Sequence, residues 1–408
     1  MSCVFCAGHA ASQSAGFPLE SVTAEGSAIP QSAILDITGL KIHSLIDEAG
    51  IEKACKKLQE SGLFASIAYR YAPGPKGYAV TLSLGDQASL FDATIDVPGA
   101  DENETWQWLT AKFHCFDHKA PQVDAAQKYL AGQIEQHLGS VMRGQHLTVR
   151  METDLKTNKS ILSFQPETLP RVVSVAFTGN RDVTSADLAA VLNQVVNYQE
   201  YTARMFALAV ELNLRPVYEQ RGLYRVRFTP GGPQWTDAGV ALNVAITEGE
   251  PYQLGGVILI GEDLPGDRML SAAKLPNGKV ANWKQIQDGI WEMEKVVRRT
   301  GFFEVRAVPE RNYDDAGHIL NLRIRIVKGP LYHFGEVNIT GLAPDLQEKA
   351  RRMWQPKPGD PYDYAYPNEF LRAFSKVVDF RNFRKYEANS QKGAGDHVMD
   401  TNLVFVVR

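Results

Sequence analysis

The sequence lacks the features that would place it in several large protein classes. No apolar run approaches the roughly 20 residues that a membrane-spanning helix requires. The formal net charge is -4, so the chain has no basic field of the kind that drives nucleic-acid binding, and we expect no nucleic-acid partner. Its 408 residues, 44% hydrophobic and 22% charged, have the composition of a soluble globular chain with about two to five domains.

Cysteine is scarce, which excludes a scaffold held together by disulfides. The four cysteines, Cys3, Cys6, Cys55 and Cys115, are too few and too scattered for such a framework. Cys3 and Cys6 form a C-x-x-C pair that could bind metal or cycle its redox state, but a lone pair favours an unstructured or processed end. Residues 1–16 lack the positive start and apolar core of a secretory signal, so we expect either a leader or a signal-peptide remnant.

The sequence motifs that could indicate catalysis are incomplete. On a helix, His114 and His118 would lie one turn apart beside Cys115, as zinc-binding pairs do, but no third ligand and no glutamate base accompany them. The glycines of residues 74–77 and 231–233 do not follow the phosphate-loop order and indicate hairpins or loops. The acidic residues of 314–317 indicate a turn between strands. We therefore expect a protein that is not an enzyme and that uses no cofactor or metal.

What the sequence does contain is a repeated pattern, clearest over residues 252–330. There an apolar run between glycines precedes two helix-like segments, the turn Gly301-Phe302-Phe303 and a long alternating strand, residues 319–327. In that strand the apolar residues face one side, while Asn321, Arg323 and Arg325 face the other. The order is β-α-α-β-β, and it predicts a small α+β domain.

Matched glycines indicate that this pattern occurs five times. Gly62, Gly139, Gly222 and Gly301 each follow a second helix about eighty residues apart, and Asn382 takes the fifth place. The second module is the least regular. In the third, Ser185 or Thr184 would cap the first helix, and residues 201–214 would form the second, with apolar positions at Met205, Leu208, Ala209 and Leu212. The expected boundaries are a leader at 1–16 and modules at 17–85, 86–168, 169–250, 251–330 and 331–408.

The joints between modules are short and contain proline. Residues 248–252 and 328–332 leave almost no linker between the third and fourth modules or between the fourth and fifth. Such joints predict a stiff or hinged array rather than domains on flexible strings.

These motifs resemble the POTRA modules of the outer-membrane β-barrel assembly factor family, which is BamA-like. The resemblance covers nearly the whole chain and is most specific in its second half. It rests on first strands with their stops, on glycine-aromatic turns and on third-strand ends: residues 257–261 and 334–341, Gly222-Leu223-Tyr224 and Gly301-Phe302-Phe303, Glu248-Gly249 and Lys328-Gly329-Pro330. It implies a three-stranded mixed sheet covered on one face by two helices. Members normally continue into a membrane β-barrel, so we expect either the soluble part of a longer protein or a stand-alone array.

In the family that this chain resembles, the second strand of a module is usually the accessible edge of the sheet. An unpaired edge presents free N–H and C=O groups to which an extended segment can add as a further strand. We place these edges at residues 224–228, 303–308 and 383–387. The alternative is that these strands only complete each core. The candidate client-binding residues are Tyr224, Arg225, Val226, Arg227, Phe303, Val305, Arg306, Phe383, Arg384 and Tyr386.

Four arginines lie on these strands: Arg225, Arg227, Arg306 and Arg384. They could steer acidic clients toward the edges. Charges on an edge are, however, also an ordinary protection against aggregation, and that interpretation is favoured here.

The resemblance implies a non-enzymatic periplasmic scaffold associated with the outer membrane. Its partners would be unfolded outer-membrane proteins and accessory assembly lipoproteins. A second hypothesis is a secretion or translocation module that recognises one dedicated passenger. A third is a metal-dependent enzyme that uses His114, Cys115 and His118.

Overall fold

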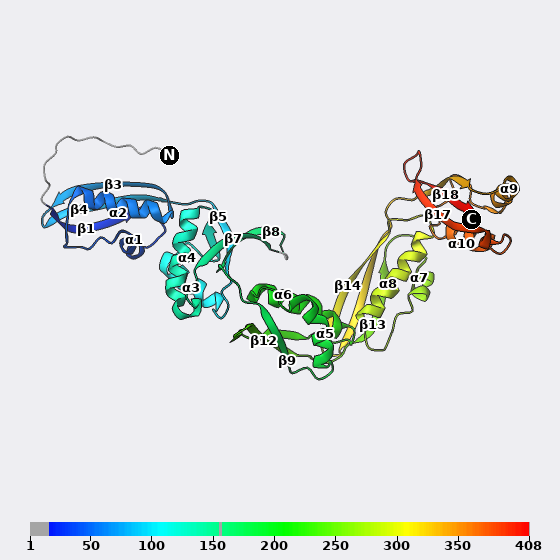
Figure 1. The fold of residues 1–408 in the computed structure, drawn as a ribbon, viewed down its shortest axis with the longest axis horizontal. Helices are drawn as coiled ribbons and strands as arrows, with labels where there is room; N and C mark the ends of the chain where they lie inside the picture. The colour runs from blue at the N-terminus through cyan, green and yellow to red at the C-terminus, as the bar shows by residue number, and fades with distance from the viewer. Residues whose placement is uncertain (1–15, 155–156, 408) are drawn as a thin grey trace. The chain divides into compact units, whose positions relative to one another are not determined.

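The computed structural model describes residues 16–154 and 157–407, in which one unit of two helices and a mixed sheet occurs five times (Figure 1). In the first, second, fourth and fifth modules the first strand runs parallel to the last. The strand between them in sequence pairs antiparallel with the other side of the last strand. The predicted α+β array of β-α-α-β-β modules is therefore confirmed.

The first module has the sheet order β2-β1-β4-β3. Its second helix begins where Asp47 accepts a hydrogen bond from the Gly50 N–H and ends at Gly62, which has a φ of 67°. Its elements are β1 (Phe17–Glu25), α1 (Gln31–Thr38), β2 (Leu45–Ile46), α2 (Glu48–Ser61), β3 (Phe64–Gly74) and β4 (Gly77–Asp86).

The second module, the least regular in sequence, keeps the same order of elements, with the sheet order β6-β5-β8-β7. Its core, around the fully buried Trp106, is continuous with that of the first module. Its elements are β5 (Leu90–Ile95), α3 (Glu102–Phe113), β6 (Lys119–Pro121), α4 (Asp124–Leu138), the 3-10 turn η1 (Gly139–Met142), β7 (Leu147–Asp154) and β8 (Lys159–Pro166).

In the third module β12 pairs with β9 and also with two short strands, β10 and β11. The Thr184 hydroxyl accepts the Asp187 N–H at 3.1 Å, so Thr184, one of the two expected residues, caps α5. Its elements are β9 (Val172–Thr178), α5 (Ser185–Val196), α6 (Ala203–Glu219), β10 (Arg227–Pro230), β11 (Gln234–Thr236) and β12 (Gly239–Thr247).

The fourth and fifth modules have the sheet orders β13-β15-β14 and β16-β18-β17. The alternation predicted for β15 is present, because Leu320, Leu322 and Ile324 are buried under the helices. The elements are β13 (Gln253–Ile260), α7 (Gly266–Ala273), α8 (Trp283–Arg298), β14 (Arg306–Asp314) and β15 (Ile319–Val327), then β16 (His333–Thr340), α9 (Pro344–Met353), α10 (Tyr366–Phe374), the 3-10 turn η2 (Phe380–Asn382), β17 (Phe383–Lys392) and β18 (Val398–Val407).

The apolar side predicted for α6 is wrong. Met205 is 49% exposed and Leu212 is 63% exposed, whereas the buried side carries Phe206, Val210 and Leu214. Both sets have helical spacing, so the periodicity alone could not decide between them. The set that contains Phe206 buries more apolar surface against the sheet, because it includes an aromatic ring.

The turn residue predicted for the fifth module is also wrong. Gly62, Gly139, Gly222 and Gly301 all have positive φ, between 51° and 97°, as the turn after a second helix requires. Asn382 lies instead in η2, directly before β17, and has no positive φ. The chain leaves α10 without a left-handed residue, so no glycine is needed there.

The described chain divides into two compact units, and the division passes through the third module. One unit runs to Thr178 and includes Leu192–Ala209 and Pro230–Val244. The other has Gly179–Val191, Val210–Thr229 and the chain from Ala245 on. None of the helices in residues 16–154 and 157–407 is long and apolar enough to cross a membrane.

Candidate functional site: the open edges of the sheets

In every module the start of the first strand, which forms one edge of the sheet, is covered by the segment that precedes the second helix. In the first two modules this segment is a short antiparallel strand, β2 against β1 and β6 against β5. In the others it forms isolated bridges: Arg171 with Glu200 in the third module, Gln253 with Val280 and Leu254 with Asn277 in the fourth, and His333 with Pro361 in the fifth. The opposite edge is the second strand of the module. Within the described ranges no further strand pairs with β3, β7, β14 or β17.

In the third module the edge strand begins later than predicted, at Arg227. Tyr224 and Val226 are buried before it. The Tyr224 hydroxyl donates to the Ala281 carbonyl oxygen at 2.6 Å, and burial raises the pKa of this phenol. Buried side chains cannot meet a client; Tyr224 instead holds the joint with the fourth module, whose core it enters.

Arg225 is exposed, but its guanidinium is bonded at the same joint. Its guanidinium donates to Asp315 Oδ1, with Nη2 at 2.7 Å, and lies 4.3 Å from the centroid of the Tyr313 ring. The Tyr252 hydroxyl donates to the same carboxylate. These two donors hold the pKa of Asp315 below its ordinary value. The acidic turn predicted between β14 and β15 is present, and its tip also fastens two modules.

A second polar contact lies nearby. Arg311 of β14 donates to Glu219, at the end of α6, at 2.7 Å. The Arg311 guanidinium also stacks 3.6 Å from the centroid of the Trp283 ring. Nothing in the sequence indicated this pair, because the partners are 92 residues apart.

Two joints use the same backbone contacts. The Tyr252 N–H donates to the Gly222 carbonyl at 2.9 Å, and the Tyr332 N–H donates to the Gly301 carbonyl at 2.8 Å. The carbonyl of each tyrosine then accepts an N–H from the segment before the second helix of its own module, Ala281 or Tyr362, at 2.8 Å. A tyrosine shortly after the joint proline, paired with a turn glycine upstream, was the signal that sequence reasoning missed.

In the fourth module the predicted residues divide in the same way. Val305 is buried, and Phe303, although 41% exposed, lies 6.1 Å from the Tyr332 ring at the next joint. Both precede β14, which begins at the exposed Arg306.

In the fifth module all three predicted residues belong to the edge strand β17. Phe383 is buried, Arg384 is exposed, and Tyr386 is 48% exposed with its ring 4.5 Å from that of Phe380. Arg384 and Tyr386 are therefore both accessible and on an edge.

The possible metal ligands do not form a helical pair. The helix α3 ends at Phe113, and both His114 and His118 have positive φ in the loop that follows. Burial raises the pKa of the Cys115 thiol to about 12. Among the residues that the structure describes, no three His, Cys, Asp or Glu side chains are grouped to hold a metal. The pair Cys3 and Cys6 lies outside the described residues.

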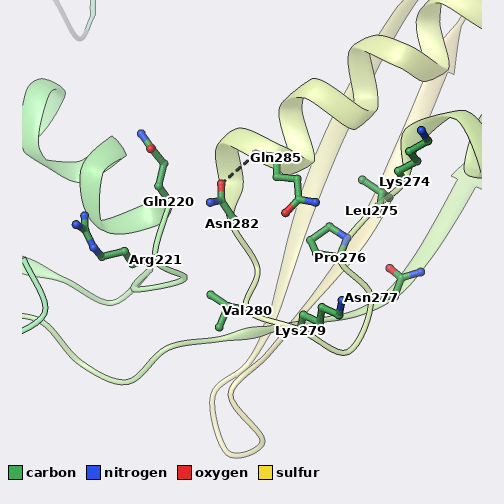
Figure 2. A pocket seen from close by; sticks show the side chains of 10 residues that line it. All are labelled: Gln220, Arg221, Lys274, Leu275, Pro276, Asn277, Lys279, Val280, Asn282 and Gln285. Carbon is green, nitrogen blue, oxygen red and sulfur yellow. Dashed lines mark hydrogen bonds between the residues drawn. The ribbon is translucent and has the colours of Figure 1, made fainter.

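An open groove lies where the end of α6 faces the α7–α8 loop (Figure 2). Figure 2 shows its cations on opposite sides, with Arg221 near α6 and Lys274 at the end of α7. Asn282 accepts the Gln285 N–H at 3.0 Å and so caps α8. The ten residues that line the groove include amides and cations but no carboxylate, and the cations do not converge on one point. The groove offers no acid–base pair.

Comparison with known proteins gives one curated relative and several solved structures. No protein-family profile matches the chain. The chain is 24% identical over 246 residues to a Treponema pallidum protein named "Putative outer membrane protein assembly factor", covering 57% of this chain. It spans 29% of the length of that relative.

Among solved structures, Haemophilus influenzae BamA POTRA3-5 is 15% identical, covering 59% of this chain and 97% of that one, with a TM-score of 0.36. POTRA1-3 of Omp85 from Anabaena is 16% identical, covering 59% and 97%, with a TM-score of 0.27. CdiB from Escherichia coli is 20% identical, covering 50% and 34%, with a TM-score of 0.23.

Proposed function

We propose a function from the premise that this chain is a tandem array of POTRA modules of the BamA-like kind: it serves outer-membrane protein assembly as a non-enzymatic scaffold. It works in the periplasm at the outer membrane and binds unfolded outer-membrane proteins by strand addition. The observation that carries the proposal is the second-strand edge of β3, β7, β14 and β17, with which no further strand of the described chain pairs, whereas the start of each first strand is covered by a segment of its own module.

The mechanism follows from the chemistry of a sheet edge. Its outward N–H and C=O groups bond to any extended backbone, whatever the side chains. Alternate side chains beside the edge add mild preference. Such a surface suits a scaffold that receives many different clients.

Of the ten residues predicted from the sequence, Arg384 and Tyr386 are those best placed to touch a client. Arg227 and Arg306, each the first residue of its strand, are exposed as well. Tyr224, Arg225, Val226, Phe303, Val305 and Phe383 contribute by holding joints and cores. Accessory lipoproteins would dock beside the edges, on the exposed faces of the modules.

Backbone resonances test the proposal. The isotope-labelled chain is titrated with two unrelated peptides, each taken from a strand of an outer-membrane protein. We expect both to perturb amides along second strands, β17 among them. Perturbations confined to helices would refute strand addition. Binding of a single passenger sequence, with no response to unrelated peptides, would favour the dedicated secretion module instead.

A further inference from the structure

The five edges differ in how many outward hydrogen-bonding groups they offer. In an antiparallel pair the residues alternate, and every second residue points its N–H and C=O away from the partner strand. An added strand needs these outward groups, so each edge can be compared through them.

On β14 the outward residues are fixed by a side-chain contact. The Ala307 N–H donates to Glu294 Oε1 of α8 at 2.8 Å, so Ala307 points away from β15. The register pairs Ala307 with Ile326 and Pro309 with Ile324, and alternation makes Pro309 the next outward residue. Proline has no N–H. Two consecutive outward donors of β14 are therefore unavailable, one occupied and one missing.

The Glu294 side chain is held in place by burial and by a second hydrogen bond. Its side chain is 13% exposed, and its other oxygen accepts from Arg298 at 2.8 Å. A strand that displaced this carboxylate from Ala307 would leave its Oε1 without a donor in a mostly buried place.

The third and second modules carry related obstacles. In the third, residues 231–233, Gly-Gly-Pro, separate β10 from β11, and Arg215 donates to the Val226 carbonyl at 3.2 Å. In the second, Glu135 of α4 accepts the Leu147 N–H at 2.6 Å and so occupies the first donor of β7. The edge of the third module is thus interrupted, and that of the second is shortened.

The edge strand β17 has no such obstacle. The Gly393 N–H donates to the Val398 carbonyl, so alternation along the register makes Tyr386, Ala388 and Ser390 the outward residues. No proline lies in β17. In the described chain no side chain bonds to its backbone.

The edge strand β3 is open as well. Pro73 pairs with Tyr78, and a proline in an edge strand lies where an N–H would face outward, which makes Ile67, Tyr69 and Tyr71 the other outward residues. Among residues 16–154 and 157–407 no side chain occupies their backbone groups. The Tyr69 and Tyr71 rings stack with centroids 6.4 Å apart, which gives a bound segment an apolar surface.

We propose that strand addition in this chain uses β3 and β17, and that β14 and the β10–β11 edge are closed to it. The inference rests on the proposed function and names where it acts. The occupant is an extended segment of another protein. On β17 the cations Arg384, Lys385 and Lys392 outnumber Glu387, so pairing with a second copy brings like charges together, whereas an acidic segment is attracted.

Photo-crosslinking of the full chain tests the proposal. A photoreactive residue is placed singly at Ala68, Lys385 or Val308, which are exposed positions that adjoin outward residues of β3, β17 and β14 respectively. The probe is a biotinylated ten-residue peptide of alternating valine and threonine with one terminal glutamate. We expect yields at Ala68 and Lys385 at least about fivefold above the yield at Val308, because losing each main-chain bond weakens binding several-fold.

Matched variants test the cause. Tyr386→Pro removes one outward donor of β17 and no ladder bond, so crosslinking at Lys385 should fall to the level at Val308. Tyr386→Ala, which removes the ring but keeps the N–H, should lower it much less than Tyr386→Pro does. Glu294→Ala combined with Pro309→Val should raise crosslinking at Val308. Circular dichroism confirms that each variant is folded.

Each outcome decides a different point. High yield at Val308 in the unaltered chain, or no effect of Tyr386→Pro, overturns this assignment of edges while leaving strand addition in place. Yield at none of the three positions overturns strand addition and the proposed mechanism together. Crosslinked dimers of the chain in the absence of peptide would overturn the assignment of the occupant.

Discussion

At the scale of single residues, the joint between the third and fourth modules depends on polar groups whose partners are far apart in sequence. Asp315 lies at the tip of a hairpin, yet it receives the Arg225 guanidinium and the Tyr252 hydroxyl. Hairpin tips are usually free, and a sequence pattern treats them so. The acidic turn was predictable from Asp314 to Gly317, but its contact 90 residues away was not.

The titration of Asp315 should report this contact. Its pKa is lowered from 3.8, first by the Tyr252 hydroxyl and then by Arg225, so the contact stabilises the folded joint above pH 3.8. The stabilisation is lost as the pH falls below 3.8 toward the folded pKa. Carbon-detected NMR of the carboxyl group should show a midpoint below 3.8 that rises in both Tyr252→Phe and Arg225→Ala. An unchanged midpoint in both variants would contradict the contact.

Arg227→Ala is the matched control for that titration. Arg227 is exposed on β10, two residues beyond Arg225, and donates to no carboxylate in the described chain. Removing its charge should leave the Asp315 midpoint unaltered. A shift as large as that in Arg225→Ala would mean that general charge, and not the hydrogen bond, sets the pKa.

At the scale of elements, the glycine before the edge strand of the fourth module serves a turn and a joint together. Gly301 has a φ of 97°, and a Cβ there would come within 2.6 Å of Leu331 and 3.0 Å of the Tyr332 carbonyl oxygen. The glycine-aromatic motif predicted the turn correctly. It did not predict the joint, because the chain that passes over Gly301 belongs to the next module.

Gly301→Ala should therefore cost more than the backbone conformation alone. We expect a loss of about 2–3 kcal/mol in the free energy of unfolding, of which about 1 kcal/mol is left-handed strain. Gly359→Ala is the matched control, since Gly359 has a φ of 93° with no atom near a Cβ, and it should lose only the strain. Denaturant unfolding measures both. Equal losses would show that the close approach at Gly301 contributes nothing.

At the scale of the whole molecule, the repeated order of elements was predictable, but the assignment of surfaces was not. Apolar alternation in β15 and the turn glycines located most helices and strands. The resemblance placed Tyr224 and Val226 on an edge strand, although both are buried before that strand begins. Strand pattern reports which side chains are buried, and it does not distinguish burial in a module's own core from burial against its neighbour.

A chain of several modules should unfold in more than one step, and a joint variant should affect one of them. Glu219→Gln leaves Arg311 without its carboxylate in a partly buried place. We expect a loss of about 2 kcal/mol, below the full value for a buried pair because both groups retain some exposure. Calorimetry should show the transition of the fourth and fifth modules lowered and that of the first module unchanged.

Lys284→Ala is the control for that variant, because the exposed pair of Lys284 with Asp288 should contribute less than about 0.5 kcal/mol. A uniform shift of all transitions in Glu219→Gln would contradict a local role for the pair.

The hairpin between β14 and β15 also bears on how the chain can change in evolution. Loops at hairpin tips usually accept insertions freely. This one has a fixed length, because Asp315 must reach both Arg225 and Tyr252. The corresponding turn between β17 and β18, residues 393–397, has no side-chain hydrogen bond to the preceding module among the described residues. Length variation among relatives should therefore accumulate in the last hairpin and be rare in the one before it, except where the arginine and the tyrosine have also been replaced.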